Sequence, residues 1–486
     1  MSHVGKSETG WLARLTRPVD LTTGTPWRVI LRYATPIILS CLLQQVYVLT
    51  DSIICGQVLT SGQVAGVNDT FPLTFIFLQF AFGCTAGFSV VTAKCVGNGD
   101  NRGVRQSFAT QVVLSVGISL ILTVLSLLLL PSMLMLINVT PDNPEVYAAA
   151  YDYCFVIFIG ILAQMGYNFI CSILRARGDS VTPLLFLGIS TALNIALDLF
   201  FLIPLRMGPA GAAIATVLAQ FLSVIFCCIY TFSKYKELRL HREDWKITVR
   251  GIADHLRNGL PMGTQLSILA IGIIVMQGAV VSFDLTESGV MVPGTPAQNG
   301  FGAATKLINF LMSAYSGLGS AILGYNAQNY GRGDHDRVRR GFLQTLLIML
   351  VIFAICLTVG LLLSIGGAYQ YIFMSADKVS EASITYGNIY IYVDLFTYAI
   401  LGFLFVSRSG TQGVMHPEYV LIAGVSELVA RVLICYFLPA AVEGHAIAAG
   451  ASNLAFATLC AGDPGAWLAA SLVLLIPTFK YMVNKE

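Results

Sequence analysis

The chain contains repeated runs of mainly apolar residues, and the length of these runs restricts its fold more than any other feature. A helix needs about 20 such residues to cross the hydrocarbon core of a bilayer, where the backbone must satisfy its own hydrogen bonds. The composition agrees, because 11% of the residues are charged whereas soluble domains have about 25%. The sequence therefore predicts an all-α integral membrane protein surrounded by the lipid bilayer.

Twelve runs are long enough to be transmembrane helices. They are residues 28–57, 67–97, 105–137, 146–174, 182–206, 209–234, 251–283, 298–329, 338–366, 381–408, 417–440 and 444–480. We expect an N-lobe of six helices at 28–234 and a C-lobe of six helices at 251–480. A cytosolic N-terminal segment at 1–27, a connector at 235–250 and a tail at 481–486 complete the expected organisation.

The basic residues indicate the orientation of these helices. Lys and Arg are enriched in cytoplasmic loops, and here they gather at both ends of the chain and in alternate loops. Of the loop residues, only Arg206 and Lys378 fall on the other side. This pattern predicts a multi-pass protein of the cytoplasmic (inner) membrane with both termini in the cytosol.

The two halves of the chain resemble each other. Ala93–Phe108 and Ala327–Phe342 share seven of sixteen residues at a constant offset of 234 (327 − 93), and Pro183 and Pro417 keep this offset. With six helices each, the two halves have the same orientation and are related by a pseudo-twofold axis along the membrane normal. Such two-lobed proteins commonly bind substrate between the lobes, so the sequence predicts a transporter.

Polar residues inside the N-lobe helices form a candidate cation-coupling site. Asp51 is in the first helix, and the i, i+4 spacing of Asn194 and Asp198 places both on one face of the fifth. Thr216 is in the sixth helix. A carboxylate within the bilayer costs roughly 2.5–3.5 kcal/mol on insertion scales, so we expect either a bound proton or a small cation between the acids. Oxygen ligands of this kind would suit Na⁺. The alternative is a hydrogen-bonded cluster that only packs the helices.

The C-lobe differs at the equivalent positions. Glu427 and Arg431 have i, i+4 spacing, which predicts a structural ion pair. The sequence leaves open whether Asp394 lines a cavity or lies near the membrane interface. The eleven cysteines lie mostly in apolar runs without ligand spacing, which indicates buried apolar side chains. We therefore expect no metal centre of the Cys or His type and no cofactor besides the coupling ion.

Four motifs of this chain resemble those of the multidrug and toxic compound extrusion (MATE) transporters. They are Pro36…Tyr47…Asp51, Arg175-Ala-Arg-Gly-Asp179…Pro183, Asn194-Ile-Ala-Leu-Asp198…Gly211-Ala-Ala-Ile-Ala-Thr216 and Glu427-Leu-Val-Ala-Arg431. The similarity extends from about residue 21 to the end of the chain. It implies a V-shaped pair of six-helix bundles that exports amphipathic, often cationic, organic compounds in exchange for H⁺ or Na⁺.

The resemblance also implies roles for single residues. Asp51, Asn194, Asp198 and Thr216 match the first-lobe cation site of the family. Tyr47, Tyr153 and Asn168 match polar residues beside that site, and Pro36 matches a proline at which the first helix bends. In the seventh helix, where sodium-dependent relatives have an acid, this chain has Gln265 and Gln277. We expect Tyr47, Tyr153, Asn168, Gln265, Gln277 and Asp394 to line the substrate cavity.

Two other classes of function are alternatives to this one. A flippase or exporter of lipid-linked or polysaccharide precursors is the main alternative, but such a protein is expected to have a basic cavity. The only basic residues assigned to helix interiors are Lys306 and Arg431. An enzyme is disfavoured because the six histidines lie at termini or loops without a catalytic set. We expect a monomer that binds small organic molecules and no nucleic acid.

Overall fold

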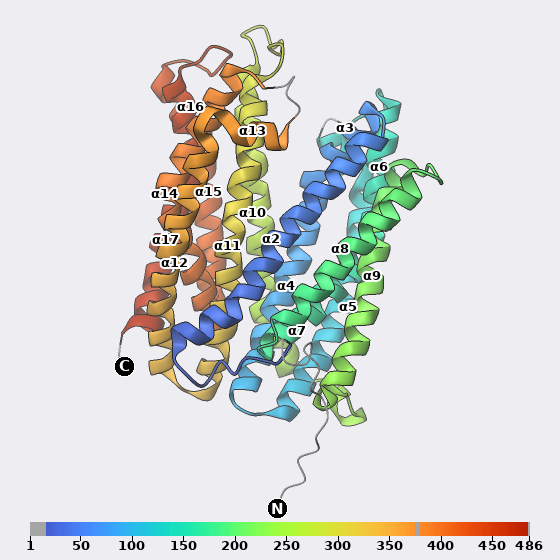
Figure 1. Cartoon of the computed structure of the whole chain (residues 1–486), viewed down its shortest axis with the longest axis vertical. Helices are drawn as coiled ribbons and strands as arrows, with labels where there is room; N and C mark the ends of the chain where they lie inside the picture. Colours follow the sequence, from blue (N-terminus) through green and yellow to red (C-terminus); the bar gives the residue numbers. More distant parts are fainter. Residues whose placement is uncertain (1–15, 138, 375–378, 485–486) are drawn as a thin grey trace, which may run out of the picture.

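The computed structural model describes residues 16–137, 139–374 and 379–484, and these are almost entirely helical. Eleven described helices are long and apolar enough to cross a membrane, and a bent pair of shorter helices makes a twelfth span. The predicted all-α, twelve-helix fold is therefore confirmed. Figure 1 shows two bundles that lie close together near the chain termini and diverge toward the opposite end. We call the face with the termini the terminal face.

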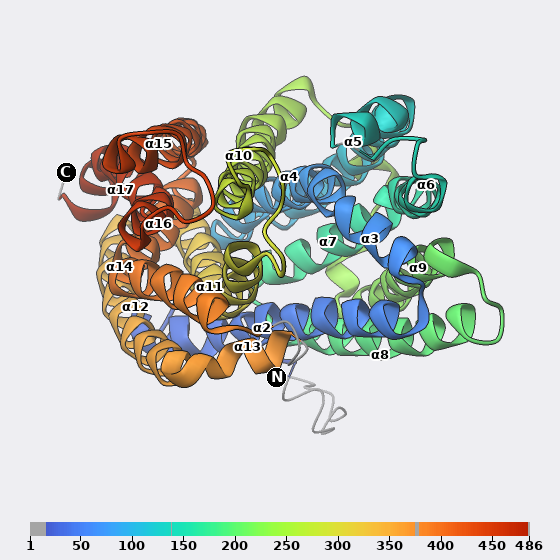
Figure 2. The same ribbon diagram turned by 90° about the horizontal axis from the view of Figure 1, so that it is seen from above.

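Each bundle contains the helices of one half of the chain. The N-lobe comprises α2 (Pro26–Val58), α3 (Ser61–Asp69), α4 (Phe71–Gly97), α5 (Asn101–Leu136), α6 (Pro144–Ile159), α7 (Ile161–Ala176), α8 (Val181–Leu202) and α9 (Gly208–Lys234). The C-lobe comprises α10 (Val249–Val281), α11 (Pro296–Arg332), α12 (His335–Ser364), α13 (Ala368–Phe373), α14 (Glu381–Gly413), α15 (Pro417–Glu443), α16 (Asn453–Cys460) and α17 (Gly462–Pro477). A π-helical turn at Thr478–Val483 follows α17. Figure 2 shows the lobes side by side, viewed from above.

Most predicted helices end within a few residues of the observed ones, and the second, fourth and last differ for reasons that the structure shows. The second begins at Phe71, because Thr70 divides α3 from α4 and Pro72 suits the first turn of a helix. The fourth bends by 46° at Gly160, between α6 and α7. The last does not begin at residue 444: Gly444 ends α15 with φ of 80°, a left-handed conformation that favours glycine. The final span therefore starts at α16.

Asp284, in the short 3-10 turn at Ser282–Asp284 after α10, has a structural role that its sequence position does not reveal. It is fully buried, and its carboxylate accepts hydrogen bonds from the backbone nitrogens of Ala297 (3.0 Å) and Gln298 (2.9 Å). Backbone N–H groups in the first turn of a helix have no partner within the helix, and Asp284 supplies one for two of those in α11. The 285–295 loop is thereby held against the start of α11.

The contact between the lobes near the terminal face has the symmetry of the sequence repeat. A β-carbon on Gly97 of α4 would overlap the backbone of Gln328, and one on Gly331 of α11 would overlap the backbone of Lys94. Since 328 is 94 + 234 and 331 is 97 + 234, the same contact occurs twice, as a pseudo-twofold axis requires. Only glycine permits such a close approach of two backbones. Residues of the sequence repeat therefore also form the contact between the lobes, which we call the joint.

Candidate functional site

The four predicted cation-site residues come together inside the N-lobe. Asp51 of α2 and Asp198 of α8 have their carboxyl groups within interaction distance of each other. Asn194 lies one turn before Asp198 on α8, and its side-chain nitrogen donates to the Thr216 hydroxyl of α9 over 3.4 Å. Asn194 and Asp198 are buried. The cluster thus joins three helices, toward the ends of α2 and α8 that are remote from the terminal face.

This acid cluster has oxygen atoms without hydrogen-bond partners among the described residues. They are both carboxylate oxygens of Asp198, one of Asp51 and the amide oxygen of Asn194. A buried polar atom without a partner costs several kcal/mol in an apolar environment, and two adjacent ionised carboxylates would also repel each other. A proton or a hard cation held by these oxygens would remove both costs, since oxygen ligands suit such ions.

Two predicted tyrosines lie beside the acids. Tyr47 of α2 is close to the Thr216 hydroxyl and to Asp51, and Tyr153 of α6 is close to Asp51 and Tyr47. Asn168 is partly exposed on α7. Pro36 lies within α2, and the helix continues through it. Tyr47 and Tyr153 therefore lie next to the acids, and their role in substrate binding stays a prediction.

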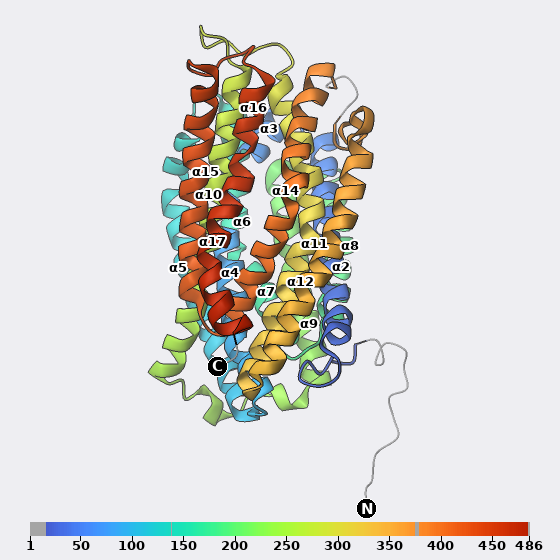
Figure 3. The same ribbon diagram turned by 90° about the vertical axis from the view of Figure 1, so that its left-hand side faces the viewer.

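The C-lobe contains a larger network of buried charges than the sequence predicted. The expected Glu427–Arg431 ion pair is present at 3.6 Å. Glu427 also binds Arg408 of α14 at 2.5 Å, and Arg431 binds Asp463 of α17 at 2.6 Å. Tyr390 donates to Asp463 over 2.9 Å. The network therefore connects α14, α15 and α17, which lie next to one another in Figure 3.

Asp394 leaves this network with one more acid than base. It is fully buried on α14 beside Tyr390 and Asp463, and neither of its carboxylate oxygens has a hydrogen-bond partner among the described residues. Three acids (Asp394, Glu427 and Asp463) thus face two arginines. The interpretation that the C-lobe neutralises its acid with one arginine was incomplete. Asp463 could have been found, because it is an acid within the last apolar run.

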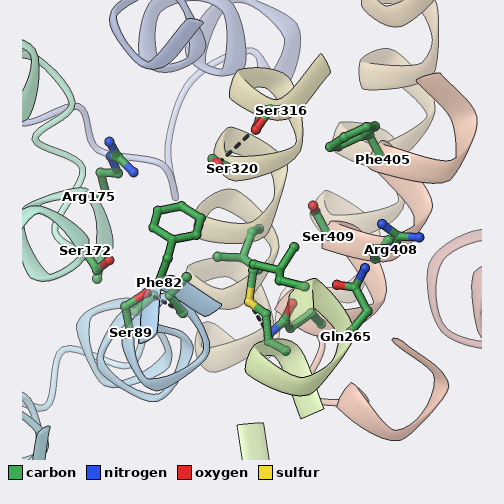
Figure 4. Close-up of a pocket in the computed structure, with 18 of the residues that line it drawn as sticks. Phe82, Ser89, Ser172, Arg175, Gln265, Ser316, Ser320, Phe405, Arg408 and Ser409 are labelled. Carbon is green, nitrogen blue, oxygen red and sulfur yellow. Dashed lines mark hydrogen bonds between the residues drawn. The ribbon is translucent and has the colours of Figure 1, made fainter. Parts of the chain in front are cut away.

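A cavity lies between the lobes in the half of the molecule near the terminal face. Residues of α2, α4, α7, α10, α11 and α14 line it, and Figure 4 shows Arg175 and Arg408 on opposite sides with Phe82 and Gln265 between them. Its volume is about 100 Å³. Gln265 is the one predicted cavity residue that lines it. Gln277 is exposed on α10, and Asp394 is buried within the C-lobe.

The arginines of this cavity correct an argument made from the sequence. The sequence pattern assigns Arg175 and Arg408 to the loops, and it leaves Lys306 and Arg431 as the basic residues within helices. Both Arg175 and Arg408 instead line the cavity between the lobes, although Arg408 turns its guanidinium toward Glu427 of the C-lobe. The absence of a basic cavity is therefore no longer a reason to reject an anionic substrate.

Two repeat-related helical lobes, a cavity between them and a cluster of buried polar residues inside one lobe are typical of a transporter. The family comparison agrees. The MatE family model matches residues 36–200 and 290–437, so the chain belongs to the MATE family of multidrug efflux transporters. It is therefore a multi-pass membrane transporter and not an enzyme.

Individual relatives support this assignment, and a solved structure shares the fold. The chain is 30% identical over 323 residues to the probable multidrug resistance protein YpnP of Bacillus subtilis, covering 66% of this chain and 68% of that protein. It is 25% identical to the probable multidrug resistance protein YoeA of the same organism, covering 65% and 66%. The outward-facing structure of a multidrug resistance MATE family transporter of the MOP superfamily superposes with a TM-score of 0.82 at 20% identity, covering 96% and 98%.

Proposed function

We propose that this protein exports small organic compounds across the cytoplasmic membrane in exchange for H⁺ or Na⁺. The observation that carries the proposal is the pair Asp51 and Asp198, in which Asp198 is fully buried. Both carboxylate oxygens of Asp198 and one of Asp51 lack hydrogen-bond partners among the described residues. Asn194 and Thr216 supply further oxygens in the same cluster. In this proposal the terminal face is cytosolic, the lobes span 28–234 and 251–480, and the protein acts as a monomer.

Coupling in this proposal depends on a difference in cation affinity between two conformations. An ion that binds both states equally cannot shift their equilibrium. The lobes contact each other near the terminal face, so substrate entry from the cytosol requires the joint at Gly97 and Gly331 to open. We propose that cation binding between α2 and α8 changes the position of α2, with Pro36 as the point of bending and Tyr47 and Tyr153 following the acids.

The proposal is tested with purified protein in proteoliposomes under separately imposed Na⁺ and H⁺ gradients. Rhodamine 123 serves as an organic probe, and its movement is measured by fluorescence. We expect one of the two gradients to drive probe accumulation and a specific ionophore to abolish it. Probe accumulation that stays the same when the Na⁺ and H⁺ gradients are both collapsed would contradict ion coupling. Probe movement that responds to neither imposed gradient would contradict it as well.

A further inference from the structure

The cavity between the lobes has the lining of an anion site. Three of its buried side-chain atoms have no hydrogen-bond partner among the described residues: Nε of Arg175, Nε of Arg408 and Nε2 of Gln265. All three are N–H donors. The lining residues include serines but no Asp or Glu. A cavity with unpaired donors and no carboxylate favours a ligand that supplies acceptors and negative charge.

The two arginines contribute differently. The charge of Arg408 is balanced by Glu427 at 2.5 Å. Arg175, at the end of α7, has no carboxylate within ion-pair distance in the part of the chain that the structure describes, and the nearby Asp179 pairs with Lys234 at 2.9 Å. Arg175 therefore brings a positive charge to the cavity that the protein does not neutralise there.

We propose that this cavity binds the anionic group, a carboxylate, sulfonate or phosphate, of an amphipathic substrate. The proposal rests on the transport function proposed above and specifies its substrate class. Phe82, Phe405 and Leu323 supply an apolar wall next to the donors. Organic ligands of drug size occupy pockets of about 300–1,000 Å³. The cavity has a volume of about 100 Å³, which is too small for a whole ligand of this size. While the lobes are close together, it therefore receives only the charged group. The apolar part of the substrate enters as the lobes separate.

Two xanthene dyes of similar shape and opposite charge test the proposal, fluorescein as the anion and rhodamine 123 as the cation. Binding to the purified full-length protein is measured by fluorescence anisotropy. We expect Arg175→Gln to weaken fluorescein binding by about tenfold or more, the loss expected for a hydrogen-bonded charge, with little change for rhodamine 123. Arg175→Lys should retain most of the fluorescein affinity. Arg177→Gln is the matched control, because Arg177 pairs with Glu237 at 2.5 Å outside the cavity.

A second variant tests the charge without removing the arginine. Ser172 lines the cavity one turn before Arg175, so Ser172→Asp should neutralise Arg175 and weaken fluorescein binding by about as much. Fluorescein that does not bind the wild type, or binds all variants equally, would overturn the proposal. So would equal loss of both dyes in Arg175→Gln. Ion-driven rhodamine transport that persists in these cases would leave the proposed function standing.

The anionic group can belong to a soluble compound or to a lipid, and a second arm of the experiment distinguishes these sources. Proteoliposomes that contain NBD-labelled phosphatidylglycerol report lipid movement between leaflets by dithionite quenching. We expect Arg175→Gln to leave the rate of lipid movement between leaflets unchanged. The reason is that the described lining of the cavity is formed by helices at the centre of the molecule. Lipid movement that Arg175→Gln abolishes would assign the anion site to a lipid headgroup.

Residues 16–25 cross from one lobe to the other at the terminal face and form hydrogen bonds with both lobes. We call this segment the strap. On the N-lobe, the backbone nitrogen of Val19 donates to the Gly178 carbonyl (2.9 Å), and Lys234 donates to the carbonyl of Thr16. On the C-lobe, Arg337 of α12 donates to the carbonyls of Leu21, Thr23 and Gly24. The Leu21 side chain is fully buried in the C-lobe core.

We also infer that the strap holds the lobes together at the terminal face and must release Arg337 before they separate there. Arg337→Gln removes the charged donor while the strap remains. We expect backbone amide exchange around Gly97 and Gly331 to become about tenfold faster, corresponding to the loss of hydrogen bonds from a charged group. Arg340→Gln is the control, since Arg340 is exposed on the same helix. Exchange that is unchanged at these glycines in Arg337→Gln would overturn the inference.

Discussion

Replacing Asp198 by asparagine is expected to reduce ion-driven export to the background rate of protein-free vesicles. The substitution keeps the shape of the side chain and removes the group that binds a proton or contributes charge to a cation site. Asp51→Asn should have the same effect, because the two carboxyl groups interact. The initial rate of rhodamine 123 transport under the effective gradient is the measurement.

The effect of these substitutions must be separated from loss of folding. Dye binding without a gradient should persist in Asp198→Asn, because coupling and substrate binding use different residues in this proposal. The double variant Asp51→Asn with Asp198→Asn should lose no more than either single variant, as expected for residues that act as one unit. Asp142→Asn, at an exposed loop position, is the control and should transport normally. Near-normal transport by Asp198→Asn would show that the acid pair only packs the helices.

The helices could be predicted from the sequence because the length of an apolar run is a local property. The boundaries were less accurate where the backbone departs from a straight helix. The bend at Gly160 and the loop at 444–452 both lie within apolar sequence, so hydropathy does not mark them. The repeat predicted the relation between lobes, and Gly97 and Gly331 show that it also forms their joint.

The candidate site in the N-lobe was predictable for a different reason. Asn194 and Asp198 lie on one helix, and their spacing alone places them on one face. Asp51 and Thr216 come from other helices, and the resemblance to a family linked them to this face. The arginines were missed because the charge rule assigns a residue to a side of the membrane by its position in the chain. Arg408 is close to the end of α14, yet its side chain turns inward to Glu427.

Replacing Arg431 by leucine should cause the largest loss of stability among the changes considered. Arg431 is buried between Glu427 and Asp463, at 3.6 Å and 2.6 Å. Removing one member of a buried ion pair typically costs about 3–5 kcal/mol, because the remaining charge stays buried without a partner. Asp394 is already unpaired nearby, so the variant would leave an excess of acids in the C-lobe. The midpoint of thermal unfolding of the detergent-purified protein measures this loss.

Two further variants show whether uncompensated charge is the cause. Arg257→Leu removes an exposed arginine that lies 3.9 Å from Glu418, and exposed pairs contribute about 0–1 kcal/mol. Its unfolding midpoint should stay close to that of the wild type. Adding Asp463→Asn to Arg431→Leu removes one of the acids left without a partner, so it should recover part of the lost stability. If the double variant is less stable than Arg431→Leu, Arg431 stabilises the C-lobe by packing, and the excess of buried acids is not what unfolds the protein.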